Sequence, residues 1–529
     1  MKITIKYTLL VACCLFITSC YKDKGNYTYT ELEKVEITLP EGVSAMAYAE
    51  EISFSPSIVS SIAGEIGADN NKYEFGCKLN YYHKNEETQR YEQWVDINPD
   101  KKKDIKFQAD FPANNYTIWY YVTNKETGVS FNAKGSVKIL SSTSEGWMVL
   151  NNVGADNKVR LDIISKNSKG EDIVAYNVLG SKAPELFNGT QIVMNPSMYY
   201  GAESIFLFSH SGAYKLSTTD LTTSAAYNIK LSDFIISSIP GEPVSMTIVN
   251  AGNSIGPTSR LCVTDAGNAY AIRSSNAGSS FETPLNTNKG GEDPTYQVSH
   301  LTGTSMMRKG NSSCVLLYDI TNKKFVGWSF NSNDNNVCFP LSDPETNKKF
   351  SFNTGMDIVD MVSTKFSDGL VYTILQDASK ARYIYGINLS GSKFTQESYY
   401  KGITAEHFND ATDYAFHSQF PFMFYSFENK VYSYNLGTGS MNQILSLPAG
   451  EEVTMLKFNL FVNPNLAMLA DHSEEFLSKQ FDLIVASTTG SENGGIVRFY
   501  KVDIEGQMSM INEFKGFDKV VDVTYRERR

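Results

Sequence analysis

One segment of the sequence has the spacing of a nucleophile motif. Gly252, Ser254 and Gly256 match the G-x-S-x-G pattern, which in α/β-hydrolases places a serine on a tight turn between a strand and a helix. A strand can precede this segment, but Pro257 follows it and another strand comes next. No helix is therefore predicted to supply the oxyanion hole, and we interpret the segment as a glycine-rich loop.

The histidines do not have the spacing of a metal site. None of them forms an H-E-x-x-H or H-x-H pattern: they are His83, His210, His300, His407, His417 and His472. His407 and His417 flank Asp410 and Asp413, which fits a hydrolytic cluster or a metal site, but strand and loop residues near one face of a repeat domain are the favoured interpretation. The acidic pairs follow no calcium-loop pattern. We predict no catalytic residue, no metal and no cofactor.

Aromatic side chains are the remaining candidates for binding chemistry. Aromatic rings with amide and carboxylate neighbours suit sugar or peptide ligands, because one face of such a ligand is apolar and its hydroxyls or amides need polar partners. The same residue types also pack between the blades of repeat folds, and we expect most of them to do so. The candidates for ligand binding are Tyr199, Tyr200, Trp328, Tyr399, Tyr400, His407 and Asp410.

Cys20 is the residue whose chemistry is predicted most clearly. Lys2 and Lys6 precede an apolar run over residues 7–17, which is too short to span a bilayer as a helix. The run ends in ITSC, the pattern of a lipoprotein signal in which small residues precede a cysteine that becomes lipidated. The alternative is an ordinary secretory signal with a chance cysteine. We predict a signal peptide over residues 1–19 and an acylated tether over residues 20–29.

Charge and cysteine usage limit the partners. The net charge is -11, and an acidic exterior gives no reason to expect nucleic acid or anionic lipid, because both need basic patches. Cys77, Cys262, Cys314 and Cys338 lack the C-x2-4-C spacing of zinc sites and lie among apolar neighbours. Buried, unreactive thiols are favoured over disulfides, which an oxidising compartment still allows.

The elements that position these residues are predicted to be short strands. Residues 30–141 contain about seven alternating runs separated by turns, which fits an immunoglobulin-like sandwich. A polar linker over residues 141–146 follows. From residue 146 to 529, strand pairs recur about every 50 to 60 residues, which predicts a β-propeller of about seven blades without the WD40 signature. Two short helices are expected, over residues 231–239 and 465–479.

Two segments carry a resemblance to a known family. The start of the mature chain, CYKDKGNYTYTEL, and the hairpin YTIWYYVTNKETGVSF resemble the PKD-like family of Bacteroidota-type surface lipoproteins. In that family a PKD-like sandwich follows the lipid anchor and precedes a propeller-like region. The resemblance implies an outer-membrane location, facing the cell surface, beside a SusC/SusD-type importer.

The function implied by this resemblance is that of a non-catalytic accessory subunit, which binds or positions an oligosaccharide or a peptide for uptake. Two alternatives stay open. One is a propeller-fold glycoside hydrolase or lyase with carboxylates on blade loops, since the separation of two carboxylates in space is not visible in a sequence. The other is a purely structural module for protein–protein interaction.

Overall fold

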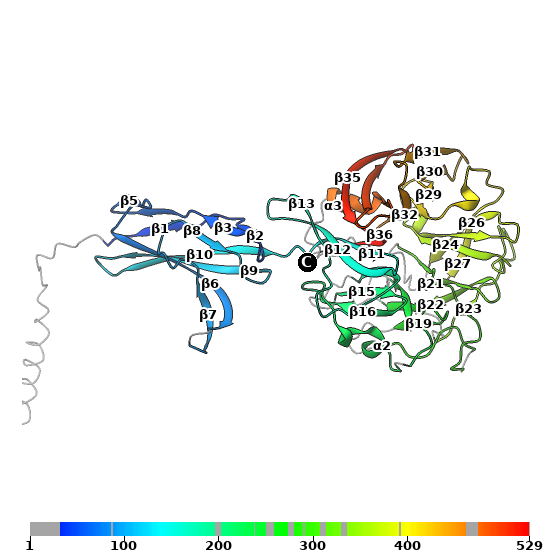
Figure 1. Cartoon of the computed structure of the whole chain (residues 1–529), viewed down its shortest axis with the longest axis horizontal. Helices are drawn as coiled ribbons and strands as arrows, with labels where there is room; N and C mark the ends of the chain where they lie inside the picture. The colour runs from blue at the N-terminus through cyan, green and yellow to red at the C-terminus, as the bar shows by residue number, and fades with distance from the viewer. Residues whose placement is uncertain are drawn as a thin grey trace, which may run out of the picture. The chain divides into compact units, whose positions relative to one another are not determined.

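The computed structural model describes residues 32–85, 88–195, 203–236, 238–249, 259–272, 280–288, 291–306, 314–329, 336–390, 393–461 and 474–527. The chain divides into two compact units, Met1–Ile139 and Leu140–Arg529 (Figure 1). Both units are built from antiparallel strands, so the predicted all-β class is confirmed. Among the described residues, no helix has the length and apolarity needed to cross a membrane.

The first unit is a β-sandwich. Its largest sheet has the strand order β2-β10-β9-β6-β7, a second sheet has the order β1-β4-β5, and β3 pairs with β8. The strands are β1 (Val35–Thr38), β2 (Ser44–Met46), β3 (Glu51–Phe54), β4 (Ser57–Ser60), β5 (Gly64–Glu65), β6 (Tyr73–Lys84), β7 (Tyr91–Asp96), β8 (Ile105–Gln108), β9 (Asn114–Asn124) and β10 (Ser130–Leu140).

The core of the sandwich follows from the alternation of side chains along its strands. In β9, Tyr116, Ile118, Tyr120 and Val122 are buried, whereas the residues between them point away from the core. The buried residues pack against the odd-numbered residues of β6, including Cys77, which is fully buried. One sheet therefore has a packed inner face and a solvated outer face.

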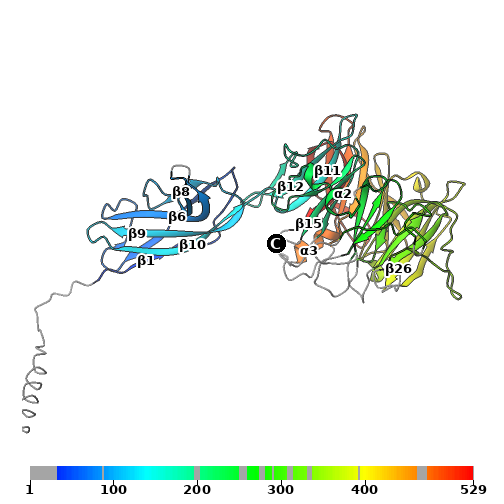
Figure 2. The same ribbon diagram turned by 90° about the horizontal axis from the view of Figure 1, so that it is seen from below.

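The second unit is a closed ring of seven sheets (Figures 1 and 2). The innermost strands of successive sheets contact one another around the whole ring, in the order β36, β14, β17, β20, β24, β28, β32 and again β36. Each sheet is one blade, so the unit is a seven-bladed β-propeller and the predicted architecture is confirmed.

Each blade runs from an innermost strand to an outermost strand, and the seven blades have the following strands in that order. They are β36 (Lys519–Arg526), β11 (Gly146–Val153), β12 (Lys158–Lys166), β13 (Asp172–Ala175); β14 (Gly189–Asn195), β15 (Ser204–Ser209), β16 (Gly212–Leu216); β17 (Pro243–Val249), β18 (Ser259–Thr264), β19 (Ala269–Ile272); β20 (Gly303–Thr304), β21 (Cys314–Asp319), β22 (Lys324–Ser329), β23 (Phe339–Pro340); β24 (Asp357–Ser363), β25 (Leu370–Gln376), β26 (Arg382–Ser390), β27 (Lys393–Tyr400); β28 (Tyr414–Phe416), β29 (Phe422–Phe427), β30 (Lys430–Asn435), β31 (Met441–Ser446); and β32 (Glu452–Phe458), β33 (Leu483–Thr488), β34 (Gly495–Val502), β35 (Met508–Phe517).

The ring is closed by the last strand of the chain. β36 pairs antiparallel with β11, with Tyr525 opposite Trp147 and Val523 opposite Val149. The first blade is therefore built from both ends of the unit. This pairing joins the two ends of the unit through backbone hydrogen bonds, without a covalent link. The ring is therefore closed between its first and last blades.

A carboxylate ties three blades together at this closure. Asp522 of β36 accepts hydrogen bonds from Lys457 Nζ in β32 at 2.7 Å and from the backbone N–H of Ile192 in β14 at 3.0 Å. It also accepts a bond from its own neighbour, Val523, at 2.9 Å. Asp522 is 7% exposed. Its bonds connect the last, first and second blades at the inner wall.

The structure corrects the predicted bounds of the first helix and describes only part of the segment predicted as the second. Helix α2 spans Ile229–Ser232 and is capped by the side chain of Asn228, which accepts a bond from Lys230 N. Residues 233–236 and 238–239 of the predicted segment are not helical, and Phe234 instead forms a β-bridge with Phe281. The second helix, α3, spans Glu474–Ser478, and residues 465–473 lie outside the described part of the chain.

Four 3-10 turns complete the helical content of the described residues. They are η1 (Ala225–Tyr227), η2 (Phe366–Asp368), η3 (Phe408–Asp410) and η4 (Lys479–Phe481). The turn η3 directly precedes the sixth blade, whose first strand is β28.

The role of Asp522 in closing the ring leads to a stability prediction. We expect Asp522→Ala to lower the free energy of unfolding of the second unit by about 2 kcal/mol, because it leaves the Lys457 ammonium and the Ile192 N–H without their shared acceptor. Asp156→Ala, at an exposed position in the turn before β12, is the matched control and should change stability by less than about 0.5 kcal/mol. Urea denaturation followed by circular dichroism measures both. Equal losses in the two variants would contradict the prediction.

Candidate functional site

Three of the sequence candidates lie outside the described residues. These are the predicted lipid-attachment residue Cys20 and the neighbouring pair Tyr199 and Tyr200. The G-x-S-x-G segment over residues 252–256 also lies outside them. What the sequence predicts for these residues stays a prediction.

Trp328 is the candidate that the structure corrects. Its side chain is 0% exposed and packs in a core cluster with Val315, Leu317 and Val326 of the same blade and with Leu261 of the preceding one. A side chain buried in this way has no surface to offer a ligand. The packing alternative, which the sequence left open for all of the aromatic candidates, describes Trp328.

Tyr399 and Tyr400 lie on β27, the outermost strand of the fifth blade, and are partly buried. The ring of Tyr399 packs edge-on against Tyr385 at a centroid distance of 5.0 Å and lies 6.1 Å from Phe350. Tyr400 packs against the core cluster shared by the fifth and sixth blades. Both tyrosines are thus part of the packing between strands and blades, far along the sheet from the inner strand β24.

His407 and His417 do not form one site. His407 precedes η3 and stacks on Phe427 at a centroid distance of 4.1 Å. His417 follows β28 at the opposite end of that strand, where it stacks on Phe420 at 4.8 Å. Burial lowers the pKa of His417 to about 4, so this histidine is neutral at physiological pH. Asp410 is exposed within η3.

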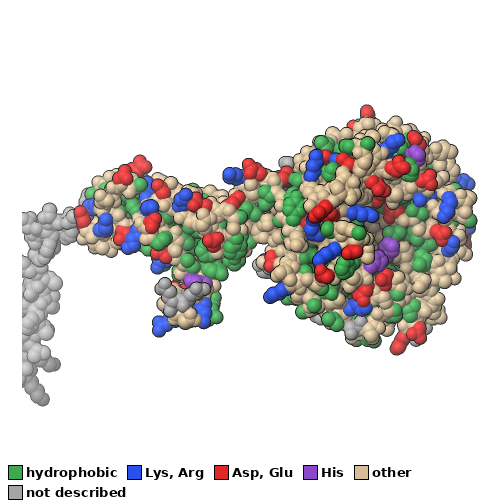
Figure 3. Space-filling model, viewed as in Figure 1, with side chains coloured by type: hydrophobic (Ala, Val, Ile, Leu, Met, Phe, Trp, Pro, Cys, Tyr) green, Lys and Arg blue, Asp and Glu red, His purple; other side chains and the backbone are tan. Residues whose placement is uncertain are grey.

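The structure instead gathers a group of charged residues near the axis of the propeller. We call Asp360, Asp413, Glu452 and Lys519 the axial group. Glu452 and Lys519 are the first residues of the innermost strands β32 and β36, Asp413 directly precedes β28, and Asp360 is the fourth residue of β24. These four strands are successive around the ring. Figure 3 shows charged side chains of both signs around the centre of the propeller face in view.

Hydrogen bonds hold the two aspartates of the axial group. Asp360 Oδ1 accepts a bond from the backbone N–H of Met361 at 2.7 Å. Asp413 Oδ2 accepts bonds from the hydroxyls of Thr412 at 2.7 Å and Ser426 at 2.8 Å. Both aspartates are partly buried, whereas Glu452 and Lys519 are exposed. Polar side chains from four blades are thus placed around one end of the inner wall.

Burial raises the pKa of Asp360 to about 7, and the negative charge of Asp413 adds to the increase, while the bond from Met361 opposes it. Burial also raises the pKa of Asp413. The hydroxyl bonds from Thr412 and Ser426 and the charge of Lys519 oppose that increase, and the charge of Glu452 favours it. At neutral pH Asp360 is divided between its protonated and ionised forms, so it can donate as well as accept hydrogen bonds.

A comparison within the ring shows what is particular about Asp360. In β24 and β36 the pairing with the neighbouring strand is interrupted by a β-bulge, and Asp360 and Asp522 are the residues that follow it. Asp522 has Lys457 as its cation. Asp360 has no ion pair within the part of the chain that the structure describes. Asp522 and Asp360 thus occupy equivalent positions in their blades, but only Asp522 is paired with a cation and takes part in closing the ring.

Sequence reasoning singled out Asp413 but not Asp360, Glu452 or Lys519. Successive members of the group are separated by between 39 and 67 positions along the chain, and the packing of successive blades brings their strands together. A bulge leaves no mark in the pattern of residue types, so the sequence gives no local signal for Asp360. In the sequence, Asp413 stands out only as one of two aspartates flanked by His407 and His417.

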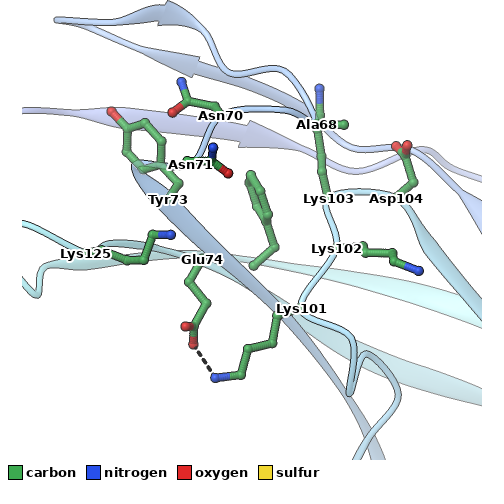
Figure 4. Close-up of a pocket in the computed structure, with 11 residues that line it drawn as sticks. Ala68, Asn70, Asn71, Tyr73, Glu74, Lys101, Lys102, Lys103, Asp104 and Lys125 are labelled. Carbon is green, nitrogen blue, oxygen red and sulfur yellow. Dashed lines mark hydrogen bonds and ion pairs between the residues drawn. The ribbon is translucent and has the colours of Figure 1, made fainter.

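The sandwich contains a separate cavity of about 450 Å³, away from the axial group (Figure 4). Its walls come from the loop before β6 and the start of β6, the loop before β8 and the turn after β9. They are lined by Ala68, Asn70, Asn71, Tyr73, Glu74, Phe75, Lys101, Lys102, Lys103, Asp104 and Lys125. Lys101 Nζ donates to Glu74 Oε1 at 2.8 Å across the cavity. Four lysines and two carboxylates line the cavity, and this ion pair uses one of each, so the lining carries a net positive charge.

Comparison with known proteins shows one family match. The model of the PKD-like family matches residues 20–196, which comprise the sandwich and the first strands of the propeller. No curated protein sequence matches the chain. The resemblance predicted from the two quoted segments is therefore confirmed for the PKD-like family.

Solved structures with a similar course of the chain include two proteins from Bacteroides. A quinoprotein alcohol dehydrogenase-like protein from Bacteroides thetaiotaomicron aligns over 92% of this chain and 97% of its own, with 12% identity and a TM-score of 0.40. A DUF4784 family protein from Bacteroides caccae aligns over 78% and 96%, with 9% identity and a TM-score of 0.29. The WD40 domain of SCAP from fission yeast aligns over 71% and 76%, with 10% identity and a TM-score of 0.24.

The raised pKa of Asp360 predicts how stability depends on pH. The unfolded carboxyl titrates near pH 4 and the folded one near pH 7, so the folded state holds the proton more tightly and stability falls as pH rises between these values. We expect Asp360→Asn to be more stable than the natural chain at pH 8, by on the order of 1–2 kcal/mol after allowance for partial exposure, with the difference disappearing toward pH 4.

Urea denaturation at pH 4, 6 and 8 measures this difference. Asp357→Asn, on the same strand but 62% exposed at its side chain, is the matched control. A difference between Asp360→Asn and the natural chain that does not change with pH would show that Asp360 titrates as an ordinary surface carboxyl.

Proposed function

We propose that this chain is an outer-membrane lipoprotein, anchored through acyl chains on Cys20 and facing the cell surface, that acts as a non-catalytic accessory subunit of a SusC/SusD-type importer. In this role it binds or positions an oligosaccharide or a peptide for uptake. The observation that carries the binding part is the axial group, which places hydrogen-bonding and charged side chains from four blades at one end of the propeller.

The chemistry of the axial group suits a ligand rich in hydroxyls or amides. A protonated Asp360 donates a hydrogen bond, the carboxylates of Asp413 and Glu452 accept them, and the Lys519 ammonium donates three. Donors and acceptors that converge from neighbouring elements are what orient a polar ligand in a binding site. A sugar hydroxyl or a peptide amide offers both functions within one group.

The location rests on the start of the chain. A positively charged segment, an apolar run of signal-peptide length and the sequence ITSC lead to Cys20, and the PKD-like match begins at this residue. Bacterial lipoproteins carry several acyl chains, and multiple chains make membrane attachment effectively permanent. The sandwich then follows as a folded spacer between the anchor and the propeller.

The first test is purification of a C-terminally tagged full-length chain from its own outer membrane in mild detergent, with mass spectrometry of the proteins that accompany it. We expect a TonB-dependent barrel and its lid lipoprotein in stoichiometric amounts. Cys20→Ala is the control, because we expect it to lose the membrane fraction and the barrel with it. Recovery of the natural chain alone would contradict the accessory role, and unchanged membrane recovery of Cys20→Ala would contradict the anchor.

One observation favours a second candidate function, that of a glycoside hydrolase or lyase. A carboxyl group with a pKa near 7 beside a second carboxylate is the arrangement that general acid catalysis uses at glycosidic bonds. In this case Asp360 is the acid and Asp413 is the base or nucleophile.

The catalytic candidate predicts activity that depends on both aspartates. If it is right, the purified chain releases reducing ends from a polysaccharide, and Asp360→Asn and Asp413→Asn each lower kcat/KM at least 100-fold, while Asp357→Asn leaves it unchanged. Reducing-end assays over a panel of plant and host polysaccharides provide the measurement. A chain that binds a polysaccharide without cleaving it supports the non-catalytic role instead.

A further inference from the structure

The outer face of the large sheet in the sandwich carries an aromatic surface. The outward side chains of β9 and β10 alternate with those of the core, and β6 and β7 extend the same face. We call this surface, made of Trp94, Trp119, Tyr121, Lys78 and Lys134, the sheet platform.

The strand register fixes the arrangement of the sheet platform. Trp119 in β9 lies between Lys134 in β10 and Lys78 in β6, which are its direct partners in the two neighbouring strands. Because directly paired residues project to the same side of a sheet, the two ammonium groups flank the indole. The ring of Trp94, from β7, lies 5.7 Å from that of Trp119 between centroids, at an interplanar angle of 59°.

A glycine lets the third ring lie flat on the sheet. Tyr121 is the direct partner of Gly76 in β6. A Cβ atom at position 76 would lie 2.0 Å from the Tyr121 ring, so only glycine allows the ring to cover the neighbouring strand. The ring thus contributes to a broad surface beside Trp119.

The composition of this face indicates the chemistry of its ligand. Its further outward side chains include the amides and hydroxyls of Asn80, Thr117, Asn132 and Ser136, together with the carboxylates of Asp96, opposite Lys78, and Glu74, opposite Thr123. Protein-docking surfaces are usually depleted in lysine. Aromatic faces bordered by hydrogen-bonding groups instead suit sugar rings, which are apolar on one side and carry hydroxyls at their edge.

The two lysines add a preference for negative charge. Lys78 lies opposite Asp96 in β7 without forming an ion pair with it, and Lys134 likewise has no ion pair within the described ranges of the chain. Other lysines of the same unit are paired, such as Lys101 with Glu74 at 2.8 Å and Lys106 with Glu51 at 3.0 Å. Two unpaired ammonium groups on either side of an indole that is 37% exposed form a place where an anionic sugar can stack and be neutralised at once.

We propose that the sheet platform binds an oligosaccharide that contains uronic acid residues, with one sugar ring on Trp119 and its carboxylate between Lys78 and Lys134. This inference deepens the proposed function and rests on it for the class of ligand. It assigns to the sandwich a role in capture, in addition to its role as a spacer.

The test uses the whole mature chain without its acyl group and two polymers that differ in charge alone. Isothermal titration with polygalacturonate oligosaccharides, and with their methyl esters as the neutral counterpart, measures affinity at two salt concentrations; alginate and hyaluronan oligosaccharides extend the panel. We expect binding of at least one acidic oligosaccharide, weakened at high salt. Trp119→Ala should lower this affinity at least 10-fold, and the double variant Lys78→Ala/Lys134→Ala should lower it to that for a neutral polymer.

Two controls separate the sheet platform from general effects. Trp119→Phe keeps an aromatic face and should retain most of the affinity, and Tyr227→Ala removes an aromatic ring that is 56% exposed on the propeller and should change nothing. Binding of no acidic oligosaccharide, or equal affinity of Trp119→Ala and the natural chain, overturns the inference. Co-purification with the importer is measured separately, so its success with a failed titration rejects the sheet platform alone.

Discussion

The pairing of β36 with β11 is the interaction on which the rest of the propeller depends. It brings the two ends of a unit of nearly four hundred residues into one sheet, and the inner strands then form a continuous ring. Each blade buries its faces only against its two neighbours, so the first and last blades would each expose an apolar face if the ring opened. Asp522 sits at this junction and joins three blades through one carboxylate. The axial group comes from four successive inner strands, the last of which is the closing strand β36.

Two carboxylates at equivalent places in the ring have been given different environments. Asp522 is neutralised by Lys457 and is part of the structure, whereas Asp360 has the charge of Asp413 nearby and holds its proton to about pH 7. The difference comes from one cation in the preceding blade. Desolvation that is not compensated by a cation costs stability, and such a cost persists most often where a group has a role in binding or chemistry. Asp522 thus has a structural role in closing the ring, whereas Asp360 is the candidate for a role in binding.

The sequence predicted the elements better than the places where they meet. Alternation of side chains in residues 115–139 and the recurrence of strand pairs after residue 146 were enough for a sandwich and a propeller of about seven blades. They were not enough to separate a buried indole at Trp328 from an exposed one at Trp119, because both lie in strands of similar composition. The period-2 pattern around Trp119, in which Ile118, Tyr120 and Val122 share the opposite face, is a signal that could have revealed the sheet platform. Net charge likewise gave no hint of two unpaired lysines on one face.

The position of β11 within its sheet has a mechanical consequence. The chain leaves the sandwich at the end of β10 and enters the propeller through β11, so any pulling force between the two units is applied to this strand. β11 is not an edge strand, because β12 pairs with it on one side and β36 on the other along nearly its whole length. Extracting it requires the backbone hydrogen bonds of two ladders to be sheared together. A tether that enters its domain in this way can bear load before the domain unravels.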